Sequence, residues 1–420
     1  MAKEKLRFAA VGCKHQAWAD ITRITAHPAV EPVAFCDVDQ RHFNEVNKQW
    51  PDKPQFSDYR KMFTEMKDEI DAVLIAVPDH SHAIITQAAL DHGFHVYCEK
   101  PLTHTVWEAR QIANQAKASG LVTRMGNQIH SEYQYRVAKI LIQEEKVIGK
   151  VKEVHTWISA AGHGRSGLLE APEKPEAAPE EIDWNQWIGP APVREYGGDY
   201  VYHPRFWRDW QDFGTGSIGD NGCHLLDPLF TSIGLTAPLS VMAEHSGMND
   251  EVYPAQETLS YVFPGTEFTT EDTLKVTWYD GGRRPRLKLP GLPSGELLPT
   301  PASIIIGEKG YLLVNHWAHP KLYPEADFAE YQWPELEKEN HYFVWVEACL
   351  AGNPDISDNF AYAGPLTETV QLGNVAVHFP GERLEWDAAA LKITNLPEAN
   401  EKLTRSYRKG WEVKEFPAEG

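Results

Sequence analysis

The chain has 420 residues, of which 42% are hydrophobic and 24% are charged. This balance is typical of globular proteins and the length predicts two or three domains, so disordered, collagen-like and coiled-coil proteins are excluded. The net charge of −20 argues against a nucleic-acid partner, and the longest apolar run, Ala72–Val77, is too short to span a membrane.

The first third of the chain alternates short apolar runs with segments of helical length. Strands are expected at Leu6–Val11, Val33–Cys36, Ala72–Val77, Phe94–Cys98 and Leu121–Met125. Helices are expected at Trp18–Ala26, Gln40–Gln49, Tyr59–Met66, Ala83–His92 and Val106–Ala118. Such alternation is typical of a parallel sheet covered by helices on both faces. We therefore predict an α/β domain over residues 1–130.

The remainder of the chain, residues 131–420, groups its strands together. A helix is expected at Tyr133–Glu145, strands at Val151–Ala160, Leu239–His245, Thr258–Phe263, Leu274–Tyr279, Ser303–Ile306 and Tyr311–Val314, and helices at Tyr342–Leu350 and Leu366–Phe379. This grouping predicts an α+β domain with an open, mostly antiparallel sheet. The proline-rich acidic stretch Glu170–Asp183 is expected to be a solvated loop, with an acidic docking site as the alternative.

The cysteines indicate the cellular compartment. There are five, Cys13, Cys36, Cys98, Cys223 and Cys349, an odd and widely spaced set without a C-x-x-C pair. They predict reduced thiols rather than a disulfide framework or a zinc site. The first residues lead directly into an apolar strand and leave no room for the apolar region of a signal peptide. We therefore expect a cytoplasmic protein.

The turn after the first strand is the expected place of a dinucleotide-binding motif, G-x-G-x-x-G. The chain reads Gly12-Cys13-Lys14-His15-Gln16-Ala17 there. Gly12 keeps its glycine and Ala17 is small enough for close packing, whereas Lys14 replaces the glycine that lets the backbone approach a pyrophosphate. A lysine ammonium could instead contact a phosphate oxygen. An ordinary strand-to-helix turn is the alternative interpretation.

The second strand ends in an acid that favours cofactor binding. Asp37 lies 25 residues after Gly12, near the usual spacing of the carboxylate that holds ribose hydroxyls. Because this carboxylate repels a 2′-phosphate, and Asp39 adds a second negative charge, we predict NAD as the cofactor and NADP as the less favoured one. Arg41 would weaken this preference.

Three further motifs follow in order along the chain. They read Val77-Pro78-Asp79-His80-Ser81-His82, Cys98-Glu99-Lys100-Pro101-Leu102 and Gly216-Ser217-Ile218-Gly219-Asp220-Asn221-Gly222-Cys223-His224-Leu225-Leu226-Asp227. Together they strongly resemble the glucose–fructose oxidoreductase, inositol dehydrogenase and rhizopine-catabolism (Gfo/Idh/MocA) family over nearly the whole chain. Asp183–Pro190, Phe206–Trp210 and Gly410-Trp411 resemble a large bacterial branch of that family.

The resemblance implies a Rossmann domain that binds a nicotinamide cofactor, and a second domain that binds substrate and forms homodimers or homotetramers. Family members mostly oxidise or reduce carbinols of sugars and cyclitols. The residues expected at the cofactor are Gly12, Lys14, His15, Asp37, Val77, Pro78, His82, Glu99, Lys100, Asn127 and Gln128. His82 could instead cap the next helix, and Asn127 and Gln128 could be turn residues.

The expected catalytic residues are Lys100, Asp220 and His224. Lys100 ends a parallel strand, where open α/β sheets bind ligands, and its ammonium could favour a deprotonated hydroxyl. Asp220 and His224 are four residues apart and share a helix face, so we expect His224 to be the base and Asp220 either to orient it or to share a hydrogen bond with the substrate. The alternatives are a turn lysine, a core histidine, or a metal site that adds Asp227. Three ligands on one helix rarely bind one ion, so no metal is expected.

Aromatic and basic residues before and around Trp210 suggest a sugar as substrate. The candidates are His163, Arg205, Trp207 and Arg208, since planar rings beside hydrogen-bond donors fit a pyranose, although each Trp could be core. His316 and Trp317 are similarly undecided. Three functions remain open: an NAD-dependent sugar or cyclitol dehydrogenase, a redox-neutral enzyme that cleaves or epimerises glycosides with tightly bound NAD, and a non-catalytic NAD- or sugar-binding protein.

Overall fold

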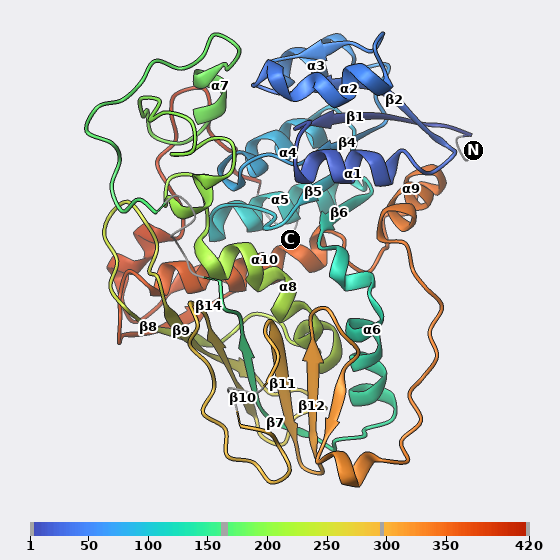
Figure 1. Cartoon of the computed structure of the whole chain (residues 1–420), viewed down its shortest axis with the longest axis vertical. Coiled ribbons are helices and arrows are strands. Elements are labelled where there is room, and N and C mark those ends of the chain that lie inside the picture. The colour runs from blue at the N-terminus through green and yellow to red at the C-terminus, as the bar shows by residue number, and fades with distance from the viewer. Residues whose placement is uncertain (1–3, 161–166, 295–297, 417–420) are drawn as a thin grey trace.

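Two sheets lie at opposite ends of an elongated molecule, with helices packed between them (Figure 1). The computed structural model describes residues 4–160, 167–294 and 298–416. Within these ranges no helix is both long and apolar enough to cross a membrane. The predicted fold class, a Rossmann-type α/β domain followed by an α+β domain with an open sheet, is confirmed.

The N-terminal sheet has six parallel strands in the order β3-β2-β1-β4-β5-β6. The strands are β1 (Leu6–Val11), β2 (Val30–Cys36), β3 (Gln55–Phe56), β4 (Ala72–Ile75), β5 (His95–Glu99) and β6 (Thr123–Gly126). Five of them match predicted apolar runs, whereas β3 is a two-residue edge strand that the sequence pattern does not predict. The chain reverses its winding between β1 and β4, so a crevice opens at the carboxyl ends of these strands.

Five helices cover this sheet, and they agree with the predicted segments to within a few residues. They are α1 (Gln16–Ile24), α2 (Asn44–Gln49), α3 (Tyr59–Glu65), α4 (His82–Asp91) and α5 (Val106–Ser119). The start of α5 is fixed by a capping box, in which the Thr105 hydroxyl accepts from the Glu108 backbone and the Glu108 carboxylate accepts from Thr105. Gly120, with a φ of 63°, ends the same helix.

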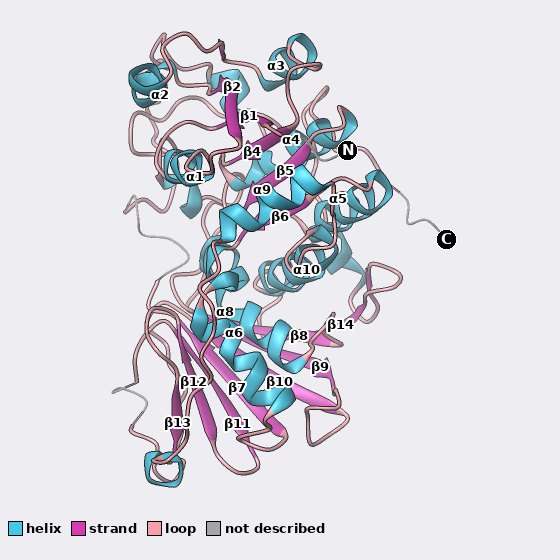
Figure 2. Cartoon of the chain, turned by 90° about the vertical axis from the view of Figure 1, so that its right-hand side faces the viewer, coloured by secondary structure: helices cyan, strands magenta, loops and turns pink. Residues whose placement is uncertain are grey.

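The C-terminal sheet has nine strands in the order β13-β12-β11-β7-β10-β9-β8-β14-β15. They are β7 (Val151–Trp157), β8 (Ser240–His245), β9 (Glu257–Pro264), β10 (Thr273–Tyr279), β11 (Ala302–Gly307), β12 (Tyr311–Asn315), β13 (Lys321–Tyr323), β14 (Arg383–Asp387) and β15 (Lys392–Ile393). Among the described strands of this second sheet, only β7 and β10 pair in parallel. Helices α6 (Tyr133–Lys139) and α8 (Gly216–Ile233) lie against this sheet (Figure 2).

The last part of the chain returns to the N-terminal domain. Helix α9 (His341–Ala351) packs on α1 and β1, and α10 (Phe360–Ala376) packs on α5 and α8. Beyond them an extended segment pairs with two buried glutamines: the Lys414 backbone exchanges hydrogen bonds with the Gln87 amide at 2.7 and 2.9 Å, and the Phe416 backbone donates to Gln111. The helical layer over the first sheet is therefore completed by residues more than 200 positions away.

Residues 167–213 form a segment that lies beside the carboxyl end of β2, drawn in green near α7 (Trp184–Ile188) in Figure 1. Its core is a cluster of aromatic rings, among them Trp187, Trp207 and Trp210. An isolated bridge joins it to the first domain, because the Asp183 backbone donates to the Val38 carbonyl at 2.8 Å. The predicted solvated loop therefore runs into a packed structure.

Candidate active site

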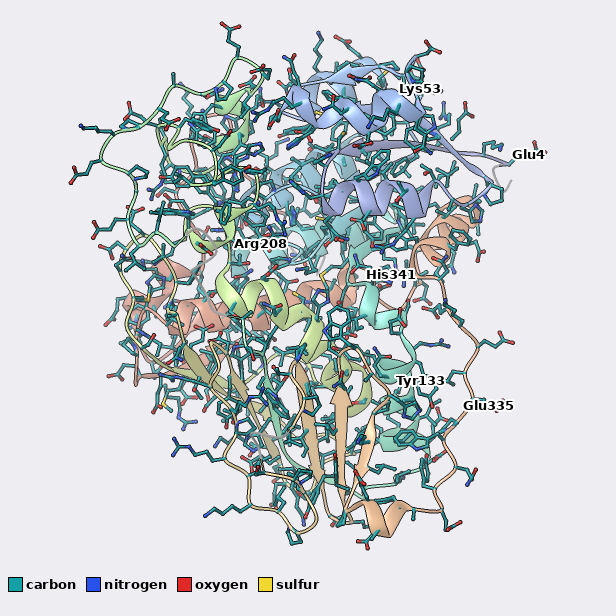
Figure 3. All side chains as sticks on the ribbon, viewed as in Figure 1. Glu4, Lys53, Tyr133, Arg208, Glu335 and His341 are labelled. Atoms are coloured by element: carbon teal, nitrogen blue, oxygen red, sulfur yellow. The ribbon has the colours of Figure 1, made fainter. Side chains whose placement is uncertain are left out.

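A cavity of about 1510 Å³ opens at the carboxyl ends of β1, β4 and β5. Its wall combines the first domain, α8, residues 200–208 and the turn after β12. Figure 3 labels Arg208 and His341, which lie on this wall between the two sheets. Fifteen residues expected at the site line it: Gly12, Lys14, His15, Asp37, Val77, Pro78, His82, Glu99, Lys100, Gln128, Arg205, Trp207, Arg208, Asp220 and His224.

Gly12 makes the tight turn that a dinucleotide requires. Its φ is 96°, and a Cβ atom there would lie 2.2 Å from the Ala76 carbonyl oxygen, so only glycine lets β1 and β4 approach this closely. Helix α1 then begins at Gln16 without a side-chain cap. Its first backbone N–H groups are therefore available to an anion at the cavity wall, as a pyrophosphate needs.

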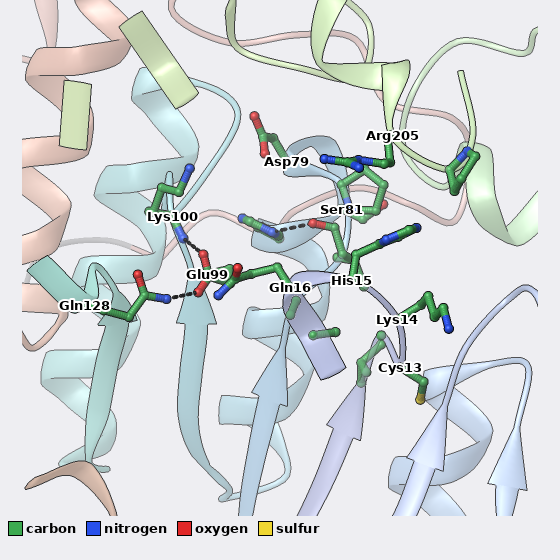
Figure 4. A pocket seen from close by; sticks show the side chains of 18 of the residues that line it. Cys13, Lys14, His15, Gln16, Asp79, Ser81, Glu99, Lys100, Gln128 and Arg205 are labelled. Carbon is green, nitrogen blue, oxygen red and sulfur yellow. Dashed lines mark hydrogen bonds between the residues drawn. The ribbon is translucent and has the colours of Figure 1, made fainter. Parts of the chain in front are cut away.

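The unusual Lys14 lies at the edge of this turn. Its ammonium is 3.6 Å from Glu45, and Figure 4 shows it directed away from Glu99 and Lys100. The next residue, His15, has a φ of 55°, so the bend that glycines usually supply is made here by a histidine in the left-handed region. The turn that faces the expected dinucleotide site is thus formed with His15 at the position of positive φ, where a glycine is usual.

Asp37 lies at the end of β2, where a ribose is expected. Its carboxylate accepts hydrogen bonds from the Cys13 and Asp39 backbones, each at 2.9 Å, and from Nδ1 of His42 at 3.1 Å. Burial alone would lower the pKa of His42, but this carboxylate holds it above its ordinary value. The acid is therefore fixed in place beside the first turn by two backbone N–H groups and an imidazole.

A second carboxylate, Asp39, clasps residues 167–213 onto the first domain. It is buried, binds Arg41 through both oxygens at 2.8 and 2.9 Å, and accepts from Nε2 of His203 at 2.8 Å. Asp39, His42 and His203 bring three possible metal ligands within 4.8 Å of one another. Because Arg41 already occupies both oxygens of Asp39, we interpret the group as an ion-pair clasp.

Lys100 and Asp220 meet at the centre of the cavity. Lys100 Nζ donates to Oδ1 of Asp220 at 2.9 Å and to its backbone carbonyl at 2.7 Å. Burial would lower the pKa of Lys100, but the Asp220 carboxylate holds it above its ordinary value. The lysine is therefore a cation at neutral pH. Arg208 lies 3.4 Å from the same carboxylate and stacks on Trp207.

His224 is oriented by Asn127 rather than by Asp220. The Asn127 Nδ2 donates to the Cys223 carbonyl at 3.0 Å, so its Oδ1 faces Nδ1 of His224 and accepts that proton. This leaves Nε2 of His224 as the unprotonated nitrogen. Burial and the Lys100 charge hold the pKa of His224 well below its ordinary value. The ring is therefore a neutral proton acceptor.

Asn127 lies away from the cavity wall, whereas His82 lies on it with both ring nitrogens engaged. Asn127 is fully buried and does not reach the cavity wall, since both ends of its amide are used by the helix that carries His224. His82 lines the cavity, but its ring nitrogens lie 2.8 and 2.7 Å from the carbonyls of Val77 and Pro101. The ring of His82 therefore braces the ends of β4 and β5. Neither of the two roles expected for His82, a cofactor contact or a helix cap, included this contact.

The metal alternative and one substrate candidate can also be placed. Asp227 does not line the cavity; its Oδ1 accepts from the Tyr362 hydroxyl at 2.6 Å and lies 2.9 Å from His130 Nδ1. It therefore faces away from Asp220 and His224 and does not complete a metal site with them. His163 lies outside the described residues.

Two acidic groups on the same wall, Asp79 and Glu99, have raised pKa values. Burial raises the pKa of Asp79 to about 7, and its carboxylate accepts from the Thr215 hydroxyl. Glu99 accepts from Gln128 Nε2 at 2.9 Å (Figure 4), and burial together with Asp20 holds its pKa well above its ordinary value. Asp79 belongs to the motif Val77–His82, but only its burial in the folded protein indicates that its pKa is raised to about 7.

Comparisons with known proteins identify the family of the two domains. The profile described as "Oxidoreductase family, NAD-binding Rossmann fold" matches residues 6–127, and the family's "C-terminal alpha/beta domain" matches residues 165–263. The 2,7-anhydro-N-acetylneuraminate hydratase of Mediterraneibacter gnavus is 27% identical over 137 residues, 33% of this chain and 31% of that protein. The putative oxidoreductase YteT of Bacillus subtilis is 25% identical over 60% of this chain and 63% of its own.

Solved structures share the fold. The WlbA dehydrogenase of Bordetella pertussis, in complex with NADH and UDP-GlcNAcA, matches with a TM-score of 0.61 at 17% identity, over 91% of this chain and 99% of that one. The matches to both curated relatives span less than two thirds of those proteins' lengths. The two family profiles together cover more than half of this sequence, and the chain therefore belongs to the Gfo/Idh/MocA oxidoreductase family.

Proposed function

We propose that the protein is an NAD-dependent oxidoreductase that transfers a hydride between a carbinol of a sugar or cyclitol and the nicotinamide. The observation that carries this proposal is the convergence of a cationic Lys100 and a neutral, proton-accepting His224 on one cavity that continues to Gly12 and Asp37. The relative solved with NADH and a nucleotide sugar supports the substrate class.

The residues of this chain divide the work of the reaction. The carbinol C–H bond breaks with its electron pair, which the oxidised nicotinamide accepts when bound. The hydroxyl proton moves to Nε2 of His224, and a C=O bond forms. The Lys100 ammonium stabilises negative charge on the reacting oxygen, while Asp220 holds that ammonium in place.

A second function, redox-neutral conversion with retained NAD, is favoured by one observation. The clasp of Asp39 with His203 and the bridge from Asp183 to Val38 fasten residues 167–213 beside the expected ribose site. Such a cover would slow release of the dinucleotide. The hydratase relative is consistent with this alternative.

The experiment measures absorbance at the NADH band with added NAD and a panel of monosaccharides, uronates, cyclitols and aryl glycosides. We expect NADH formation with at least one carbinol, and we expect His224→Ala to lower the rate by roughly 10²- to 10⁴-fold. The matched control is His319→Ala, an exposed histidine outside the cavity. Cleavage of an aryl glycoside without net NADH, by protein that carries NAD from purification, would replace the first function by the second.

A further inference from the structure

A second histidine faces the cavity beside His224. His316 follows β12, is 6% exposed, and its ring centroid lies 5.4 Å from that of His224. Its backbone is fixed on both sides, since the Gln134 amide donates to its carbonyl at 2.8 Å and its N–H donates to Pro301 at 3.2 Å. Both imidazoles line the cavity, and within the described chain no hydrogen bond engages the Nε2 atom of either.

The proton of His316 is assigned by Tyr135. The Tyr135 hydroxyl is buried on α6, and its one hydrogen bond among the described residues joins it to Nδ1 of His316 at 2.8 Å. Burial holds the pKa of Tyr135 well above its ordinary value, so the phenol keeps its proton. A buried hydroxyl that donates to nothing is unfavourable, so Tyr135 donates and Nδ1 of His316 accepts. The ring proton of His316 then lies on Nε2, the nitrogen on the cavity side.

The two rings therefore offer opposite chemistry at one place. His224 presents an unprotonated Nε2 because Asn127 takes its Nδ1 proton, and His316 presents an Nε2–H because Tyr135 fills its Nδ1. Both rings are neutral: burial and the Lys100 charge lower the pKa of His316 to about 4, and the same causes act on His224. A neutral imidazole with a fixed N–H is a hydrogen-bond donor to an oxygen, not a proton acceptor.

We propose that His316 is a second substrate-contacting residue, whose Nε2–H binds the oxygen next to the one that His224 deprotonates, so that the site recognises two neighbouring hydroxyls of a polyhydroxylated ring. The substrate part of this inference rests on the proposed function. The proton positions do not, because they follow from contacts within the protein. Tyr135 is the positioning residue in this scheme, since it acts only through His316.

The first test reads the ring protons directly. In protein labelled with ¹⁵N-histidine and free of substrate, long-range ¹H–¹⁵N spectra distinguish Nδ1–H from Nε2–H rings. We expect Nε2–H for His316 and Nδ1–H for His224, and we expect Tyr135→Phe to remove the preference of His316. The control is Tyr133→Phe on the same helix, whose hydroxyl donates to the Pro334 carbonyl instead. A His316 ring protonated on Nδ1, or one unchanged by Tyr135→Phe, would overturn the inference.

The second test uses the sugar or cyclitol of highest turnover and its monodeoxy analogues. In the unmodified protein, removal of the hydroxyl beside the oxidised carbon should lower kcat/KM about ten-fold, the effect of one lost hydrogen bond. His316→Ala should lower kcat/KM for the full substrate by a similar factor and leave the deoxy analogue nearly unaffected. An equal loss on both compounds overturns the contact. If no compound is turned over, the result counts against the proposed function. The ¹⁵N-histidine spectra of the first test then still decide the role of His316.

Discussion

Four histidines near the cavity fall into two pairs, although all four are largely buried. His42 and His130 each bind a carboxylate, Asp37 and Asp227 respectively, and their pKa values are raised despite burial. His224 and His316 bind an amide oxygen and a phenol, lie near Lys100, and have lowered pKa values. Burial does not separate the two pairs; the charge of the nearest partner does.

The two pairs of histidines therefore have different roles, since one pair anchors carboxylates and the other faces the substrate side of the cavity. The histidines with raised pKa values hold carboxylates: His42 fixes Asp37 where a ribose is expected, and His130 ties β6 and its following turn to α8 through Asp227. The neutral pair keeps one nitrogen each for the substrate side. A cation beside two neutral imidazoles thus keeps the proton acceptor uncharged around pH 7.

Removing the cation should have the largest effect on this division. Lys100→Met removes the charge near the reacting oxygen, so we expect turnover to fall roughly 10²- to 10³-fold. Without that charge the pKa values of His224 and His316 should rise toward 6.5, the ordinary value for histidine. Steady-state kinetics and an NMR titration measure both quantities. The control is Lys61→Met on the surface of α3, and unchanged pKa values would break the comparison.

His130→Asn tests the charged pair through stability. Burial would lower the pKa of His130, but Asp227 raises it to about 9 from 6.5. A raised folded-state pKa stabilises the fold fully below pH 6.5 and ceases to do so as the pH rises through 9. The variant should therefore lose about 3 kcal/mol of unfolding free energy near pH 6, and this part of the loss should vanish above pH 9. Urea unfolding at both pH values measures it, with His319→Asn as the control; a pH-independent difference would contradict the linkage.

Asp37→Ala should have the smallest of these effects, on cofactor binding. Loss of the carboxylate removes the hydrogen bonds expected for the ribose and the repulsion of a 2′-phosphate. We expect NAD affinity to fall about ten-fold and the preference over NADP to narrow. Calorimetric or fluorescence titration with both dinucleotides measures this, with the exposed Asp52→Ala as the control. Equal affinities of the variant and the unmodified protein for NAD would remove Asp37 from the cofactor site.

The parts of the fold that follow from local pattern were predictable. The buried parallel strand β4 is a continuous apolar run, so its position follows from the sequence. The strand β14, by contrast, is short and alternates exposed and buried residues beside the edge strand β15, so its signal in the sequence is too weak. Helix α10 was expected to begin at Leu366, yet Asn359 caps it and Pro365 lies inside it. A strong cap and packing against α5 outweigh one lost hydrogen bond there.

The candidate site shows the same limit. Lys100, Asp220 and His224 stand in motifs whose positions place them at a strand end and on a helix face, so their meeting could be anticipated. No local pattern pairs Tyr135 with His316, which are 181 residues apart, or shows that Asn127 faces His224 rather than the cavity. Protonation states depend on such tertiary partners. The sequence thus shows which residues belong to the candidate site, but it does not show the protonation state in which each would bind a ligand.

The return of the chain end to the first domain has a consequence for synthesis. A ribosome releases β1 to β6 and α5 long before Lys414 and Phe416, which hydrogen-bond the buried amides of Gln87 and Gln111. Until those residues emerge, two amides that end up enclosed have only water as a partner. A fragment cut near residue 130 should accordingly be prone to chaperone capture or proteolysis, because the first domain is completed only once Lys414 and Phe416 have been synthesised.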